Sequence, residues 1–219
     1  MVSPGSGAVA DHRDVHPCDA RNLSVSTASH RRARAEVSAW ARRRISDPAT
    51  IFLDTETTGL GAGAEIIDLA VVDVAGNVLI DTLIAPMAPI PPETTRVHGL
   101  VDADVAGSPS WIEVYPAFSE LIHARPIVVY NAAFDRRMIA GCCAFAGFPE
   151  KEQEWHCAML HYARFAGARS ENRHSRFRYH KLSDALASFN LPAGSHRALS
   201  DAMACRALVI ALANFDDPS

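Results

Sequence analysis

The sequence lacks the features that mark membrane, secreted and zinc-binding proteins. None of its apolar runs reaches about 18 residues, which excludes a membrane-spanning helix. Residues 1–30 lack the charged start and the apolar block of about 7–15 residues that a secretory signal needs. The five cysteines contain no C-x-x-C pair, which argues against a structural zinc site and a disulfide scaffold. We therefore expect a cytoplasmic protein without a membrane partner.

Lysine is also scarce, because only Lys151 and Lys181 accompany the arginines among the 21 basic residues. Positive charge concentrates at the start of the chain, where residues 1–47 carry eight arginines and five acidic residues. The remainder carries 13 basic and 20 acidic residues. An acidic body argues against tight nucleic-acid binding, unless several of the acids surround a bound cation.

The chain is expected to divide into three segments. Residues 1–30 have no apolar period, which predicts disorder. Residues 31–47 form an Arg-rich helix or linker, which ends before Pro48 because the residue before a proline disfavours helical geometry. The folded domain is predicted over 49–214, so deletion of residues 1–47 should leave the fold intact.

The apolar pattern predicts an α/β fold with a mixed sheet flanked by helices. Three antiparallel strands are expected over 50–55, 65–74 and 78–84, because Ala75-Gly76-Asn77 supplies a hairpin turn between the last two. A further strand is expected over 126–130, inserted among helices. The predicted helices cover 93–100, 110–123, 133–146, 157–165, 182–189 and 198–213.

Asp54 and Glu56 form the first candidate site. They lie in the segment IFLDTETTGL, where strand alternation places both carboxylates on one face. Burying two like charges together is costly unless a cation compensates them. A hard divalent ion held by oxygen ligands is the natural compensation. Taken alone, the motif is equally consistent with a strand end whose two acids are both in water.

Asp135 is the second candidate, in the motif Asn131-x-x-Phe134-Asp135 at the start of a predicted helix. It borders the apolar face of that helix, because Met138 and Ile139 follow it by three and four residues. Taken alone, this motif favours a simpler role, an acid at a helix start with Asn131 as a nearby cap.

His196 and Asp201 form the third candidate. Asp201 shares a helical stripe with the apolar residues Ala198 and Cys205, so its carboxylate needs a partner. A continuous helix would rotate His196 about 140° away from Asp201. A loop at Gly194 could instead turn the histidine toward the same point. Taken alone, a histidine is more often structural than catalytic.

Three further segments carry weaker signals. The glycines of 59–63 suggest a dinucleotide loop, but a strand follows them, and without a helix N-terminus the motif loses its mechanism. Residues 169–181 interleave basic and aromatic side chains, which is typical of nucleic-acid contacts and equally of a solvated loop. The Arg-rich residues 31–44 are expected to aid nucleic-acid or partner binding, but not chemistry.

The order of these motifs resembles the DEDDh family of 3′→5′ exonucleases, which includes the epsilon proofreading subunit of bacterial DNA polymerase III, RNase T and oligoribonuclease. The resemblance covers 50–212 and includes the segments LDTETTGL, VHGL and NAAFD. It implies the ribonuclease H-like fold and hydrolysis of terminal phosphodiesters with two Mg²⁺ or Mn²⁺ ions. Such a pair of ions stabilises the attacking and leaving oxygens together.

The resemblance also implies a role for each candidate residue. Asp54 matches the ligand of both cations, Glu56 and Asp201 match ligands of the cation that activates water, and Asp135 matches the ligand of the other. His196 matches the general base, a task that suits histidine because it changes protonation near neutral pH. The positions that match substrate contacts are Thr57, Leu60, His98, Asn131 and Phe134.

We therefore expect a 3′→5′ exonuclease that releases nucleoside 5′-monophosphates from nucleic acid with a free 3′ end, with single-stranded or frayed DNA favoured. An RNA-trimming exoribonuclease is the alternative. A catalytically silent nucleic-acid-binding or polymerase-associated module is a third reading, which the intact carboxylates and histidine argue against. Only 18 residues follow Asp201. The tail that tethers the epsilon subunit to its polymerase is therefore expected to be absent, which favours a stand-alone enzyme of open oligomeric state.

Overall fold

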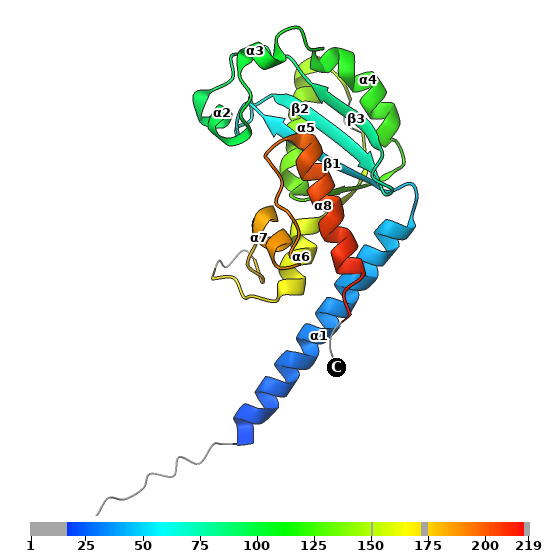
Figure 1. Cartoon of the computed structure of the whole chain (residues 1–219), viewed down its shortest axis with the longest axis vertical. Coiled ribbons are helices and arrows are strands. Elements are labelled where there is room, and N and C mark those ends of the chain that lie inside the picture. Colours follow the sequence, from blue (N-terminus) through cyan, green and yellow to red (C-terminus); the bar gives the residue numbers. More distant parts are fainter. Residues whose placement is uncertain (1–16, 150, 172–174, 217–219) are drawn as a thin grey trace, which may run out of the picture.

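A mixed β-sheet forms the centre of the computed structural model, which describes residues 17–149, 151–171 and 175–216, with side chains from residue 28 onward. Five strands of this part lie in the order β3-β2-β1-β4-β5 (Figure 1). The first three are antiparallel neighbours, and β4 and β5 continue the sheet parallel to β1. Their bounds are Ile51–Thr57, Ile66–Asp73, Val78–Leu83, Pro126–Val129 and Glu154–Cys157.

The predicted hairpin between β2 and β3 is present. The carboxylate of Asp73 accepts hydrogen bonds from the backbone and side-chain N–H groups of Asn77, both at 2.8 Å. Gly76 between them has a φ of 93°, a left-handed conformation that glycine adopts without a steric penalty.

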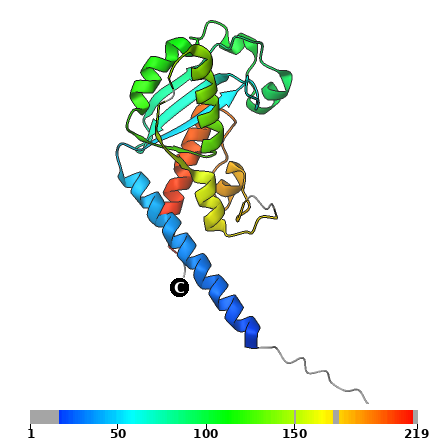
Figure 2. The same ribbon diagram turned by 180° about the vertical axis from the view of Figure 1, so that it is seen from behind.

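Helices cover both faces of the sheet. Alternate β1 residues point to opposite sides, so Leu53 packs under α4 and α5 while Phe52 packs under α8 and its neighbours α1, α6 and α7. Figures 1 and 2 show α8 on one face and α4 and α5 on the other. The bounds of these helices are Pro17–Ser46 (α1), Trp111–Ile122 (α4), Ala132–Ala146 (α5), Ala158–Ala166 (α6), Leu182–Ala187 (α7) and Ala198–Ala213 (α8).

Two short helices, α2 (Pro92–His98) and α3 (Asp102–Val105), connect β3 to α4. Val105 of α3 and Leu100, which lies between the two helices, form a small separate cluster with Ile67 of β2 and Ile90. None of the helices in the described part of the chain has the length and apolar character needed to cross a membrane.

The sequence patterns did not predict β5 or α3. Each has only four residues, and β5 consists of Glu154, Trp155, His156 and Cys157, which show no alternation of apolar and polar side chains. β5 forms because β4 offers a parallel partner, with register pairs from Pro126↔Glu154 to Val129↔Cys157. Such pairing between distant segments leaves no local period to detect.

The prediction of disorder over 1–30 is wrong for residues 17–30, which belong to α1; residues 1–16 lie outside the described part. The helix is held at its C-terminal half, where α1 packs against α6 and α8. Adding turns to an existing helix costs far less than nucleating a new one. The helix can therefore extend toward Pro17 without an apolar face of its own.

The prediction that the folded domain begins near residue 49 is also wrong. Val37, Trp40 and Ala41 of α1 are buried in the same core as Phe52 and α8. The Trp40 ring stacks on His161 of α6 with ring centroids 3.6 Å apart. An apolar face of only a few residues is sufficient here, because it covers one edge of a helical layer that would otherwise be open. Helix α1 is thus part of the fold and not a linker.

Candidate active site

The C-terminal half of β1 carries two carboxylates on one face of the sheet. Asp54 and Glu56 alternate with Thr55 and Thr57, and both carboxylate residues are half-buried. β1 pairs with β4 only through Ile51 and Phe52. From residue 53 onward β4 therefore does not cover this edge of β1, and helices can approach it. The pair is therefore not the fully hydrated strand end that the motif alone also allowed.

Asp201 reaches these two carboxylates from the first turn of α8. One carboxylate oxygen each from Asp54, Glu56 and Asp201 lies within 4.8 Å of the others. Asp201 Oδ1 is buried without a hydrogen-bond partner in the described part. The Gly194 backbone lies so close that a Cβ at this position would overlap Oδ1 of Asp201. Only glycine leaves room for the carboxylate there.

Asp135 reaches the group from the first turn of α5, which begins where β4 ends. Its Oδ1 accepts a hydrogen bond of 2.8 Å from the Thr55 hydroxyl, which ties α5 to β1. Asp135 lies close enough to Asp54 that its negative charge is the strongest of the neighbouring charges that raise the pKa of Asp54. Asn131 occupies the N-cap position of α5, but its side chain makes no capping hydrogen bond.

The four carboxylates repel one another in their ionised forms. Burial raises the pKa of Asp54 well above its ordinary value, and the charges of its neighbours raise it further. Burial, followed by the charges of Asp201, Asp68 and Asp135, raises the pKa of Glu56 to about 8. Burial raises the pKa of Asp135 to about 7. Ionised carboxylates that are buried so close together need protons or cations to compensate their negative charge.

These residues fit a divalent metal ion. Hard divalent cations prefer oxygen ligands, and carboxylates are the donors that the cluster supplies. The unpartnered Oδ1 of Asp201 is a buried acceptor for which the described residues provide no donor. The match of chemistry and geometry makes Asp54, Glu56 and Asp201 one candidate ligand set, with Asp135 beside Asp54.

His196 lies in the loop before α8 and not in the helix. Arg197 is the N-cap of α8, and the exposed His196 precedes it with a φ of 55°. Burial raises the pKa of Asp201, whereas the charge of His196 and the backbone N–H groups of Ser195 and His196 oppose that rise. The loop therefore brings His196 next to Asp201, as the glycine at position 194 allowed.

The sequence did not predict two residues of the site, Asp68 and Arg197. Asp68 of β2 is only 1% exposed, and its Oδ2 accepts hydrogen bonds from Arg197 Nε at 2.8 Å and from the Ala198 backbone N–H at 3.2 Å. Asp68 is the register partner of Glu56, so the two side chains lie on the same face. The signal was a lone carboxylate inside an otherwise apolar strand, which required a partner.

The five predicted substrate contacts differ in exposure. Leu60 is 78% exposed, and its carbonyl accepts a hydrogen bond of 3.5 Å from Arg137. The Arg137 guanidinium also lies 5.5 Å from the centre of the half-buried Phe134 ring. The Thr57 hydroxyl donates to Gly59 O at 2.7 Å. Arg137 thus connects the loop that contains Leu60 to the Phe134 ring.

His98 is buried at 6% exposure. Its Nδ1 accepts a hydrogen bond of 3.1 Å from Leu100 N–H, and its buried Nε2 has no partner in the described part. Burial lowers the pKa of His98, which favours a neutral ring. The exposed Asn131 lies at the start of α5, four residues before Asp135.

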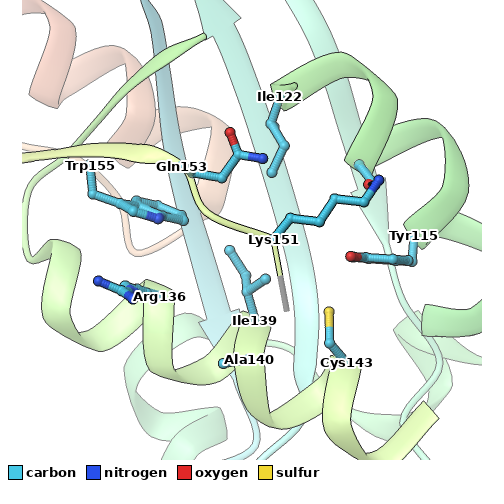
Figure 3. A pocket seen from close by; sticks show the side chains of 10 residues that line it. Tyr115, Ile122, Arg136, Ile139, Ala140, Cys143, Lys151, Gln153 and Trp155 are labelled. Carbon is cyan, nitrogen blue, oxygen red and sulfur yellow. Dashed lines mark hydrogen bonds between the residues drawn. The ribbon is translucent and has the colours of Figure 1, made fainter. Parts of the chain in front are cut away.

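A separate pocket lies on the opposite face of the sheet. It is lined by residues of α4, α5 and the chain before β5, among them Tyr115, Ile139, Lys151 and Gln153 (Figure 3). Tyr115 and Ile139 belong to the core that packs against Leu53, and not to the one under α8. None of the four carboxylates lines this pocket, so it is not the candidate active site.

Part of the basic segment 169–181 lies beside α1 and α6. Arg169, Arg176 and Phe177 line a hollow together with His30 of α1 and Arg164 of α6. Residues 172–174 of this segment lie outside the described part. Its predicted contact with nucleic acid stays a prediction.

Comparison with known proteins places these features in a family. Residues 51–209 match the family model described as "Exonuclease", RNase T. An uncharacterized exonuclease, CP81, of Escherichia phage 186 is 35% identical over 187 residues, which cover 82% of this chain and 95% of the relative.

Two solved structures show the same arrangement of chain. Exonuclease X in complex with 5′-overhanging duplex DNA is 29% identical with a TM-score of 0.55, and the match covers 75% of this chain and 91% of that one. The nuclease domain of 3′hExo, a DEDDh family member bound to rAMP, is 14% identical with a TM-score of 0.58, over 73% of this chain and 89% of that one. The predicted ribonuclease H-like fold is confirmed.

Proposed function

The chain belongs to the exonuclease family and is a nuclease, and from that premise we propose that it removes nucleotides one at a time from the 3′ ends of DNA, with two Mg²⁺ or Mn²⁺ ions as cofactors. The observation that carries this proposal is the approach of three carboxylate oxygens, from Asp54, Glu56 and Asp201, to within 4.8 Å. DNA is favoured because the related exonuclease X is described in complex with 5′-overhanging duplex DNA, whose 3′ end is recessed.

The carboxylates would hold the cations. Asp54, Glu56 and Asp201 supply the donors of one ion, and Asp135, next to Asp54, supplies a donor for the second. When bound, two such ions stabilise the attacking and leaving oxygens of a phosphodiester together. The Thr55 hydroxyl holds Asp135 in place, and Gly194 leaves room for Asp201.

His196 is the general base in this proposal. Its imidazole accepts a proton from the attacking water, and its place beside Asp201 brings it to the same end of the site. The exposed Leu60 and the Phe134 ring offer apolar surfaces against which the terminal base can stack. Thr57, His98 and Asn131 line the approach to that nucleotide, and the neutral, buried His98 offers its unpartnered Nε2 for a hydrogen bond.

The test is hydrolysis of a 5′-labelled single-stranded DNA, a recessed duplex and an RNA of the same sequence, each with Mg²⁺, Mn²⁺ or EDTA. We expect a ladder that shortens from the 3′ end, mononucleotide products, no turnover in EDTA and near-complete loss in Asp54→Asn. Full activity in chelator would overturn the metal mechanism. Faster turnover of RNA would overturn the DNA preference, and binding without turnover would favour the silent module.

We also propose that the protein works in the cytoplasm. Among the residues whose side chains are described, Cys142, Cys143, Cys157 and Cys205 are not joined in disulfides, which suits a reducing compartment. Fractionation of the native host, with the protein detected by antibody, would test this placement.

A further inference from the structure

We propose that Asp68 is a positioning residue for the reaction, which fixes the loop of the general base through its ion pair with Arg197. The inference rests on the proposed function, since it assigns the pair to the same site. It concerns a residue that lies on β2, outside the motifs that carry the carboxylates and the histidine.

The pair lies at the start of α8, directly after His196. Asp68 Oδ2 binds both the Arg197 side chain at 2.8 Å and the backbone N–H of Ala198 at 3.2 Å. Those two groups belong to the N-cap and the first residue of α8. A carboxylate from β2, an interior strand of the sheet, thus caps this helix from a distance of 130 residues in sequence, and satisfies an N–H group that the helix itself cannot.

His196 has an unusual backbone conformation. Its φ of 55° lies in the left-handed region, which a residue with a side chain occupies only when its surroundings hold it there. Two tethers flank it in sequence. On one side, the Ser195 backbone N–H donates to the Ser200 hydroxyl at 3.0 Å, and on the other, Arg197 is bound by Asp68. Loss of either tether releases the backbone that carries the imidazole.

The two side chains of the pair differ in burial. The Asp68 side chain is 1% exposed, whereas the Arg197 side chain is 45% exposed. A partly exposed arginine gains little from a surface ion pair, but a buried carboxylate opposite Glu56 requires a partner. The ion pair therefore restrains Arg197 and its loop, and it contributes little to the stability of the arginine itself.

The experiment compares Asp68→Asn and Arg197→Ala with Asp81→Asn, in single-turnover hydrolysis at saturating oligonucleotide and Mg²⁺. Asp81 is an exposed acid on the neighbouring strand β3 and also acts electrostatically on Arg197, so its variant tests the loss of a nearby charge alone. We expect Asp68→Asn and Arg197→Ala to lower the rate by about 10–100-fold, the range typical of residues that orient catalytic groups. Asp81→Asn should stay within about twofold of wild type.

Each variant is also made in a His196→Ala background, because a residue that acts through His196 has little left to affect once the imidazole is gone. We expect Asp68→Asn to change the rate of His196→Ala by less than about twofold, while the Mg²⁺-induced rise in Tm is retained. Equal losses in both backgrounds, or a wild-type rate in both Asp68→Asn and Arg197→Ala, would overturn the proposal.

The two proposals fail in different ways. An inactive wild-type protein would refute the exonuclease assignment. An active wild type with unaffected pair variants would refute only the role of Asp68. If Asp68→Asn does not fold, Arg197→Ala decides the question, because the arginine is half-exposed and its loss leaves the Ala198 N–H contact to Asp68 in place.

Discussion

The protonation of the buried carboxylates couples the stability of the fold to pH. The pKa of Glu56 is raised to about 8 and that of Asp135 to about 7, from ordinary values of 4.5 and 3.8. A carboxyl group with a raised pKa holds its proton more tightly in the folded than in the unfolded chain. Stability is therefore highest at the acid end of this range and falls as pH rises through it, when the unfolded chain ionises first.

From this sign we predict that, in EDTA, the Tm falls as pH rises from about 4.5 to 8, and that Glu56→Gln makes the fall shallower. The gain of the variant at pH 8 should be about 1–2 kcal/mol, or roughly 2–8 °C, since the side chain is partly solvated. Thermal melts between pH 5 and 8.5 measure it. Glu93→Gln, at an exposed position of α2, is the control. Identical slopes in all three proteins would contradict the prediction.

A second prediction concerns the general base. His196→Ala should lower the single-turnover rate by about 10²–10⁴-fold and remove the rise of activity with pH, because no imidazole remains to accept the proton. The carboxylates remain, so the Mg²⁺-dependent rise in Tm should persist. His123→Ala changes an exposed histidine at the end of α4 and should leave the rate unchanged. A His196→Ala variant with the wild-type rate and pH profile would assign the base elsewhere.

A third prediction tests the close approach of the backbone to Asp201. Gly194→Ala places a methyl group where Asp201 Oδ1 lies, so either the loop or the carboxylate must move. We expect activity to fall by at least about tenfold while the protein remains folded, because the change lies in a surface loop. Gly63→Ala, where a Cβ meets nothing within 4 Å, is the matched control. Equal activities of the two variants would show that the approach is not required.

At the scale of elements, the parts with strong local patterns were predictable. β1, β2 and β3 are segments of six to eight residues rich in apolar and β-branched side chains, and a turn marks the hairpin between β2 and β3. β5 and the pairing of Asp68 with Arg197 both depend on segments far apart in sequence. The carboxylates could be found because each lies beside a recognisable strand or helix start. The approach of Asp54, Glu56 and Asp201 to within 4.8 Å follows only from the sheet order and the early end of β4 pairing.

Helix α1 is a further element whose packing could not be predicted from its own sequence. Val37, Trp40 and Ala41 lie three and four residues apart, which is a helical stripe of minimal length among six arginines. Such a stripe is consistent with both a linker and a docked helix. The surface that decides between them is the layer of α6 and α8, which forms only in the folded chain.

We predict that Trp40→Ala destabilises the protein by about 3–5 kcal/mol, because a large ring that is 6% exposed is removed from the core and from its stack on His161. Arg43→Ala, at an exposed position of the same helix, should change stability by less than about 0.5 kcal/mol. Urea unfolding of both variants measures the difference. A protein that lacks residues 1–47 should fail to fold cooperatively, and a stable truncation would show that α1 is dispensable.

At the scale of the whole molecule, the positive charge of α1 lies far from the carboxylates. Arg42 binds the carbonyl of Ala213 at the last turn of α8, whereas Asp201 lies in its first turn. The separation of twelve positions along the helix corresponds to about 18 Å. A stacked strand, which rises about 3.4 Å per nucleotide along its axis, therefore extends about five nucleotides from its 3′ end before it meets this end of α1.

This geometry predicts a dependence on substrate length. We expect the combined substitution of the exposed Arg31, Arg32 and Arg43 by Gln to raise KM and to flatten its dependence on salt for a 30-nucleotide DNA, since fewer counterions are released on binding. With a DNA of two nucleotides, which is too short to span the distance even when it is extended, the variant and wild type should agree. The rate at saturation should be the same for both proteins on both substrates, because none of the three arginines lies near the carboxylates. KM measured between 50 and 200 mM salt decides the matter, and a change that is equal for both lengths would place α1 outside the path of the substrate.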